Sequence, residues 1–243
     1  RHWRGAAGLC VRGRDAGLMI FGEQLTAAGT TASAAWIQPA CRRTDATVGN
    51  LVPNDYSSFL RVRPPPPISG DWWATYRDLY EAVAAIGARH TSRADRAWFA
   101  VWEGHGFDSV HVQVAWSDRP IDDTERQARE ATRARLRDES RTRTAAIRAE
   151  LATVPRFALP DRTYYLMEGP VAAVVGMRDP VTGHWRNPDL FWPDDRRWFV
   201  ATDVDFWSLY VGGSVSFIDD LAAFLPAGTT ERVTLERELV SED

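Results

Sequence analysis

Two short acidic segments carry the side chains with the widest chemical range in this chain. Glu103 and His105 lie in the glycine-flanked stretch E-G-H-G-F, and Asp203 and Asp205 lie two residues apart in D-V-D. On a strand, residues two apart point to the same face, so both aspartates would be presented together. Carboxylates and an imidazole could hold a divalent cation or transfer protons. These four residues are therefore the candidate catalytic set.

The same residues also have a plain structural explanation. The glycines beside His105 account for a turn without any ligand, and a D-x-D pair also fits the wet face of an edge strand. The spacing matches no established zinc signature. The sequence therefore predicts no metal site, and catalysis by these residues is kept as an alternative.

The most aromatic stretch of the chain covers residues 187–214, N-P-D-L-F-W-P-D-D-R-R-W-F-V-A-T-D-V-D-F-W-S-L-Y-V-G-G-S. The periodicity of this stretch predicts that most of its aromatic residues lie in the core. Any indole or guanidinium group of the stretch that is exposed would suit ligand binding. The two arginines could equally neutralise the neighbouring Asp194 and Asp195. Ser214, directly before an apolar helical pattern, favours an N-cap over an anion site. The candidate binding residues are Trp192, Arg196, Arg197 and Trp207.

Composition restricts the class of protein. Among 243 residues, 44% are hydrophobic and 26% charged, as in an ordinary globular protein, but 11 tryptophans are unusually many. All 29 basic residues are Arg and the net charge is −4, so we predict no nucleic-acid partner and no membrane partner. The absence of Lys excludes P-loop and Schiff-base chemistry. The motifs G-x-S-x-G, H-E-x-x-H and C-x-x-C are also absent, which disfavours the familiar hydrolases, zinc proteases and redox proteins.

Cysteine usage and the N-terminal pattern favour a cytoplasmic location. Cys10 and Cys41 are too few for a zinc cage and do not indicate a disulfide scaffold. The apolar run from Ala16 to Gly22 is too short to span a bilayer, and the charged residues before it interrupt any signal-peptide core. We predict no cofactor.

The pattern of apolar residues predicts an α+β fold with a mixed, mainly antiparallel sheet flanked by helices. Helical spacing predicts a helix at 72–88, capped by Asp71 and with Trp72 in its core-facing stripe, and a second helix at 215–224. Residues 118–153 mix Arg with acidic residues and predict a charged, solvated helical insertion. Strands are expected at 97–102, 110–116, 163–167 and 197–204.

These elements predict a single domain over residues 50–226. The first 49 residues are rich in Gly, Ala, Thr and Arg and show little periodicity, so we expect them to be weakly ordered. Residues 227–243 are expected to form a C-terminal tail.

Three stretches resemble a group of uncharacterised proteins from high-GC bacteria. They are H-T-S-R-A-D-R-A-W-F-A-V-W-E-G-H-G at 90–106, the pair Gly169-Pro170, and the aromatic stretch 187–214. The similar blocks cover about residues 50 to 225, and the resemblance implies a shared architecture with no assigned catalytic residues. Separately, L-V-P-N-D-Y-S-S-F-L at 51–60 is similar to the opening of SUKH immunity proteins, which bind toxins with an α+β domain. That similarity implies protein binding.

The sequence as a whole favours a non-catalytic cytoplasmic binding or interaction protein. Its partner is expected to be another protein, contacted through exposed aromatic residues and the Arg/Glu-rich insertion. The alternative is a metal-assisted hydrolase or transferase that uses the candidate catalytic set. The two hypotheses differ in geometry, because catalysis requires those four side chains to converge in one pocket.

Overall fold

The computed structural model describes residues 20–41, 46–66, 71–107, 122–205 and 207–239. It confirms the α+β fold: the described strands form one nine-stranded sheet in which every pair is antiparallel. The strands are β1 (Thr26–Ala27), β2 (Ser58–Val62), β3 (Ala97–Trp102), β4 (Arg156–Leu159), β5 (Arg162–Gly169), β6 (Leu190–Pro193), β7 (Trp198–Ala201), β8 (Leu209–Gly213) and β9 (Thr230–Val233).

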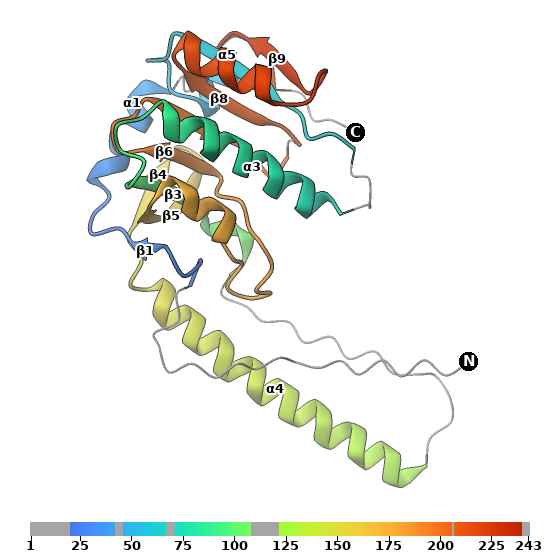
Figure 1. The fold of residues 1–243 in the computed structure, drawn as a ribbon. Helices are drawn as coiled ribbons and strands as arrows, with labels where there is room; N and C mark the ends of the chain where they lie inside the picture. Colours follow the sequence, from blue (N-terminus) through green and yellow to red (C-terminus); the bar gives the residue numbers. More distant parts are fainter. Residues whose placement is uncertain (1–19, 42–45, 67–70, 108–121, 206, 240–243) are drawn as a thin grey trace.

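The strands follow the order β1-β5-β3-β6-β7-β8-β2-β9, and β4 pairs with the same edge of β5 as β1 does. The helices are α1 (Ile37–Ala40), α2 (Val48–Leu51), α3 (Trp72–Arg89), α4 (Asp123–Leu151) and α5 (Val215–Phe224), with 3-10 turns η1 (Ala32–Ala34), η2 (Glu103–His105) and η3 (Val171–Gly176). Helices α3 and α5 lie side by side over one face of the sheet (Figure 1).

Both faces of the central strands are buried. In β3, Phe99 and Val101 belong to the core beneath α3 and α5, whereas Trp98 and Ala100 pack against the segment that contains α1 and α2. The same alternation continues through β6, β7 and β8. Because both faces are covered, β3 appears in the sequence as a continuous apolar run rather than an alternating one.

Helix α3 agrees closely with the helix predicted at 72–88. The Asp71 side chain accepts a hydrogen bond from the Ala74 N–H at 3.1 Å, as a cap should. The prediction for Trp72 was wrong, because this residue is 41% exposed instead of facing the core. The first turn of α3 lies beyond the sheet interior, at the ends of the strands, where a pocket replaces the core.

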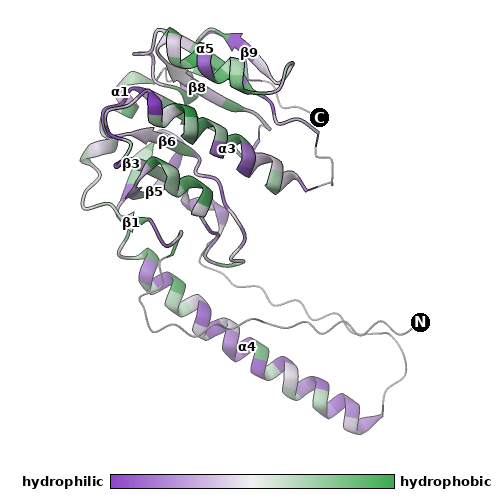
Figure 2. Cartoon of the chain, viewed as in Figure 1, coloured by the Kyte–Doolittle hydropathy of each residue, from purple (hydrophilic) through white to green (hydrophobic). Residues whose placement is uncertain are grey.

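The charged insertion forms one long helix, α4. Asp122 caps it by accepting from the Glu125 N–H at 2.7 Å, and Glu125 pairs with Arg129 at 2.9 Å. Its buried residues, Ile147 and Leu151, lie near its C-terminal end. The helix extends away from the sheet (Figure 1), and its surface is largely hydrophilic (Figure 2).

The prediction that the first 49 residues are weakly ordered is wrong for residues 20–41 and 46–49. Phe21 and Ile37 are 1% and 0% exposed, and β1 pairs with β5. The predicted C-terminal tail is likewise partly sheet, because β9 pairs with β2. Neither segment shows a regular apolar period, so each folds through contacts with a sheet that the local sequence pattern does not show.

The strand predicted at 197–204 is shorter in the structure. Strand β7 ends at Ala201, so Asp203 and Asp205 lie in the turn before β8 and not on a strand. The Thr202 hydroxyl closes this turn by donating to the Ser208 carbonyl at 3.1 Å. The strand predicted at 110–116 lies outside the described residues.

None of the described helices has the length and apolar composition that crossing a bilayer requires.

Candidate functional site

A pocket of about 500 Å³ lies at one end of the central strands. Strands β3 and β7 end there and β6 and β8 begin there, because neighbouring strands are antiparallel. The first turn of α3 forms the remaining wall. We call this hollow the Trp-lined pocket; its lining residues are Asp71, Trp72, Trp73, Tyr76, His105, Arg186, Asn187, Asp189, Thr202, Asp203, Val204 and Trp207.

A buried histidine–aspartate pair forms part of the pocket wall. The Nε2 atom of His105 lies 3.1 Å from each carboxylate oxygen of Asp189. Their side chains are 11% and 4% exposed. The imidazole is held between the rings of Trp102 and Phe107, at centroid distances of 5.2 and 5.6 Å. In enzymes, a carboxylate hydrogen-bonded to a histidine in this way orients the imidazole for proton transfer.

Asp189 is fixed by the backbone of the sheet. Its carboxylate accepts from the Trp102 N–H at 2.7 Å, its own N–H donates to the Ala100 carbonyl, and its carbonyl accepts from the Thr202 N–H. The Tyr80 hydroxyl donates to the carbonyl of Pro188 at 2.8 Å and secures the preceding loop. Burial raises the pKa of Tyr80 well above its ordinary value, so this hydroxyl stays a donor.

Asp203 is neutralised by an arginine from β5. Arg162 Nη2 lies 2.8 Å from one Asp203 oxygen and 2.9 Å from the other, and its guanidinium stacks over the Trp102 ring at 4.5 Å. Asp203 also accepts from the Asp205 N–H at 3.0 Å. The carboxylate of Asp203 is therefore fully engaged within the protein.

Arg186 differs from the other charged side chains of the pocket. Its side chain is 14% exposed, and its guanidinium lies over the Phe107 ring at 5.3 Å. The Nε atom is buried without a hydrogen-bond partner among the described residues, and the Asp179 carboxylate is 4.0 Å away. Burial lowers the pKa of Arg186 below its ordinary value, against the opposing effect of Asp189 and Asp179.

The mouth of the pocket is aromatic. Trp72, Trp73 and Trp207 are 41%, 55% and 51% exposed, and Tyr76 lies behind them. The ring of Trp207 is 5.4 Å from that of Trp72 and 6.0 Å from that of Tyr76. Large exposed apolar side chains grouped over a concave surface are typical of a binding site.

The structure brings only part of the predicted residues together. His105, Asp203 and Trp207 line the Trp-lined pocket. Glu103 instead pairs with Arg156 at 2.9 Å, outside that lining. Trp192 was expected to bind a ligand, but it is 0% exposed and stacks on Phe199 in the core. That prediction was wrong because the β6 position of Trp192 points into the second buried face of the sheet.

Asp205 also lies outside the Trp-lined pocket. It is 71% exposed and lines a separate hollow together with Cys41. Burial raises the pKa of Cys41 to about 12, so its thiol is protonated and a poor nucleophile at neutral pH. Among the described residues, no three His, Cys, Asp or Glu side chains are grouped as metal ligands would be.

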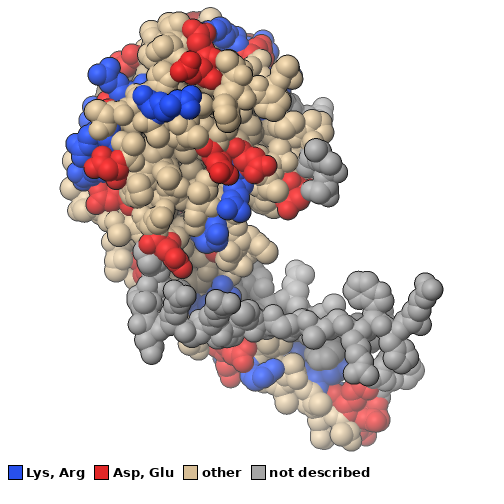
Figure 3. Space-filling model, viewed as in Figure 1, with Lys and Arg blue, Asp and Glu red and all other residues tan. Residues whose placement is uncertain are grey.

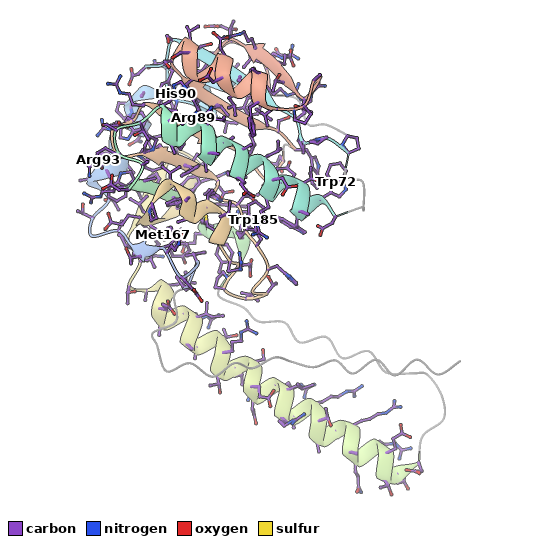
Figure 4. All side chains as sticks on the ribbon, in the orientation of Figure 1. Trp72, Arg89, His90, Arg93, Met167 and Trp185 are labelled. Atoms are coloured by element: carbon purple, nitrogen blue, oxygen red, sulfur yellow. The ribbon has the colours of Figure 1, made fainter. Side chains whose placement is uncertain are left out.

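Arg196 and Arg197 line a second hollow of about 570 Å³, together with His90 and Ser214. Arg196 stacks over Trp36 at 5.0 Å, and the Ser214 hydroxyl accepts from the Phe217 N–H at 3.2 Å as the cap of α5. Trp72 and His90 mark opposite ends of α3 (Figure 4), so the two hollows lie at opposite ends of this helix. The predicted binding residues Arg196 and Arg197 therefore line a different hollow from Trp207.

Several pocket residues carry no local sequence pattern that marks them as functional. Asp189 and Arg186 lie in a loop with no motif, and Asp189 is 84 residues from its partner His105. The exposure of Trp72 and Trp73 had no such signal either, since other adjacent residues of the same helix, Leu79 and Tyr80, are both buried. No protein-family model, curated protein or solved structure matches this chain. The resemblances described above therefore stay predictions.

Proposed function

We propose that this chain is a binding protein whose Trp-lined pocket takes a small organic molecule with a flat ring. The observation that carries the proposal is the convergence of three exposed indoles over a pocket with a polar, hydrogen-bonded wall. Indole faces stack on flat rings, and the polar groups behind them can orient the ligand. A volume of about 500 Å³ suits a small molecule.

Acid–base catalysis in the same pocket is the second candidate function. The His105–Asp189 pair favours it, because the buried carboxylate orients an imidazole that borders the ligand space. The four-residue, metal-assisted version has less support, since Glu103 and Asp205 lie outside the pocket lining. A catalytic pocket must also bind its ligand, so ligand binding is the function to test first.

The partner and location predictions rest on composition and charge. We propose a cytoplasmic location from the two scattered cysteines. On the face shown in Figure 3, acidic and basic side chains of the described residues are interspersed over the body of the molecule. This pattern and the net charge of −4 favour a neutral or mixed-charge partner over a polyanion. Binding to another protein stays a prediction.

The test of the pocket is ring binding measured with a neutral probe, 2-naphthamide, by isothermal titration calorimetry. We expect saturable binding, which Trp207→Ala weakens by about 2- to 10-fold because a stacking partner is lost. Phe224→Ala is the matched control, since Phe224 is an exposed aromatic residue on α5 that does not line the pocket. Equal affinities for the two variants, or no saturable binding to wild type, would contradict the proposal.

A further inference from the structure

We propose that the ligand carries a carboxylate on its flat ring and that Arg186 binds this carboxylate. The inference rests on the proposed function, because it names the class of molecule that enters the same pocket. It assigns the anionic group to the polar wall and the ring to the three indoles of the mouth. Arg186 and the indoles line one continuous hollow, so a single small molecule can contact both.

The first argument is the unmet hydrogen-bonding capacity of Arg186. A guanidinium has five N–H donors in a planar arrangement. In the described part of the chain, no hydrogen bond joins this guanidinium to another residue, and the Asp179 carboxylate at 4.0 Å is beyond hydrogen-bonding distance. A buried guanidinium N–H without a hydrogen-bond partner, here that of Nε, is costly, and a ligand can supply hydrogen bonds to the other N–H groups of the guanidinium.

The second argument is that the other charges of the pocket already have partners. Asp189 is bonded to His105 and the Trp102 N–H, Asp203 to Arg162, and Asp71 to the Ala74 N–H of α3. A cationic ligand would therefore have to displace an existing partner from one of these carboxylates. An anionic ligand displaces no hydrogen bond, because none joins Arg186 to another described residue and its ion-pair partner Asp179 lies 4.0 Å away.

The third argument concerns geometry. Two parallel N–H groups of a guanidinium match the two oxygens of a carboxylate, and this bidentate arrangement is strong and directional. Packing over the Phe107 ring at 5.3 Å holds the guanidinium plane in place. A guanidinium held in this way loses less conformational freedom on binding, which favours a planar carboxylate.

The experiment compares three ligands that share one ring: 2-naphthoate, 2-naphthamide and 2-naphthyl phosphate. Calorimetry on the wild-type protein should show 2-naphthoate binding about 10- to 100-fold more tightly than 2-naphthamide, as a charge-assisted pair predicts. Similar affinities for these two ligands would overturn the role of Arg186 and leave the pocket's ring-binding function intact. Tighter binding of the phosphate than of the carboxylate would overturn the choice of carboxylate.

Variants of Arg186 provide the second measurement. Arg186→Met keeps an apolar stem of similar length, and it should reduce 2-naphthoate affinity to the level of 2-naphthamide while leaving 2-naphthamide binding unchanged. Arg186→Lys keeps the charge without the planar pair of donors and should recover only part of the affinity. Arg141→Met on α4 is the matched control, because Arg141 is 80% exposed and outside the pocket, and it should change neither affinity.

The melting temperature of the unliganded protein, read together with ligand affinity, separates a ligand anchor from a structural arginine. Arg186→Met leaves Asp179 without its ion-pair partner at 4.0 Å, so a lower melting temperature is expected whether or not Arg186 binds a ligand, and the loss of 2-naphthoate affinity is the result that only a ligand anchor gives. A lower melting temperature with unchanged 2-naphthoate affinity would overturn the proposal. If neither 2-naphthoate nor 2-naphthamide binds wild type, the proposed function itself fails, and this inference fails with it.

Discussion

Asp189 links the sheet to the wall of the Trp-lined pocket. Its backbone bridges β3 and the end of β7, and its carboxylate holds both the Trp102 N–H and the His105 ring. The carboxylate is almost completely removed from water, so these bonds replace its hydration. The orientation of His105 thus depends on a residue that also holds two strands in register.

Replacing Asp189 by asparagine tests this dependence. The amide keeps the volume of the side chain but loses the charge and one acceptor, so the Trp102 N–H or His105 is left poorly bonded. We expect Asp189→Asn to lower the free energy of unfolding by about 1.5–3 kcal/mol in urea titrations. Asp205→Asn, at a 71% exposed carboxylate, should change it by less than about 0.5 kcal/mol. Equal effects of the two substitutions would show that the Asp189 contacts contribute little.

Sequence reasoning finds single residues of this pocket more easily than pairs of residues. His105 was identified because a histidine between glycines in a turn is a recognisable local pattern. Its partner Asp189 precedes an apolar strand as many aspartates do, and only the antiparallel pairing of β3 with β6 brings the two together. Arg186 was missed for a similar reason, since burial of an arginine depends on contacts that the sequence does not display.

At the scale of elements, the distance between α3 and the sheet is set by a glycine. Gly87 lies on the buried face of α3, and a Cβ at this position would come within 2.7 Å of the Trp198 ring. The Trp198 Nε1–H donates to the Gly87 carbonyl at 2.9 Å, so the close approach is held by a hydrogen bond as well as by packing. The first turn of α3 lines the Trp-lined pocket and its C-cap His90 borders the second hollow, so this contact helps to position one wall of each.

Gly87→Ala should therefore destabilise the protein although Ala favours helices. The added methyl group forces α3 away from β7, and such overpacking costs about 1–3 kcal/mol, partly offset by about 1 kcal/mol of helix propensity. We expect a net loss of up to about 2 kcal/mol in the free energy of unfolding. Ala85→Gly, on the exposed face of the same helix, measures the propensity effect alone. A stabilised Gly87→Ala variant would mean that α3 can shift without cost.

The elements that sequence reasoning predicted well are those with a strong internal pattern. Helices α3 and α5 have an apolar stripe and a capping Asp71 or Ser214, so their bounds were predicted almost to the residue. Strand β9 and the segment with α1 and α2 have weak patterns and were missed. They become ordered by covering an edge or a face of the sheet, which is a tertiary effect.

The whole molecule combines a tightly packed body with one helix that is attached at a single end. Both faces of the sheet are covered, and the large aromatic residues of β3, β6 and β7 fill the two cores. Among the described residues, the buried ones of helix α4 are Ile147 and Leu151, at the end nearest the body (Figure 1). In the middle turns, the pairs Arg135–Glu139 and Arg141–Asp138 are exposed, and such pairs contribute little to stability.

Unfolding of α4 should therefore be separable from unfolding of the body. Arg137→Pro places a proline in an exposed turn in the middle of α4, where it breaks the helix locally at a cost of about 3 kcal/mol. We expect a loss of far-ultraviolet circular dichroism, while the free energy of unfolding followed by tryptophan fluorescence in urea changes by less than about 0.5 kcal/mol, because the core contacts of Ile147 and Leu151 remain. Arg137→Ala should alter neither signal. A fluorescence-monitored stability that falls with Arg137→Pro as far as with a core substitution would show that α4 and the body unfold as one cooperative unit.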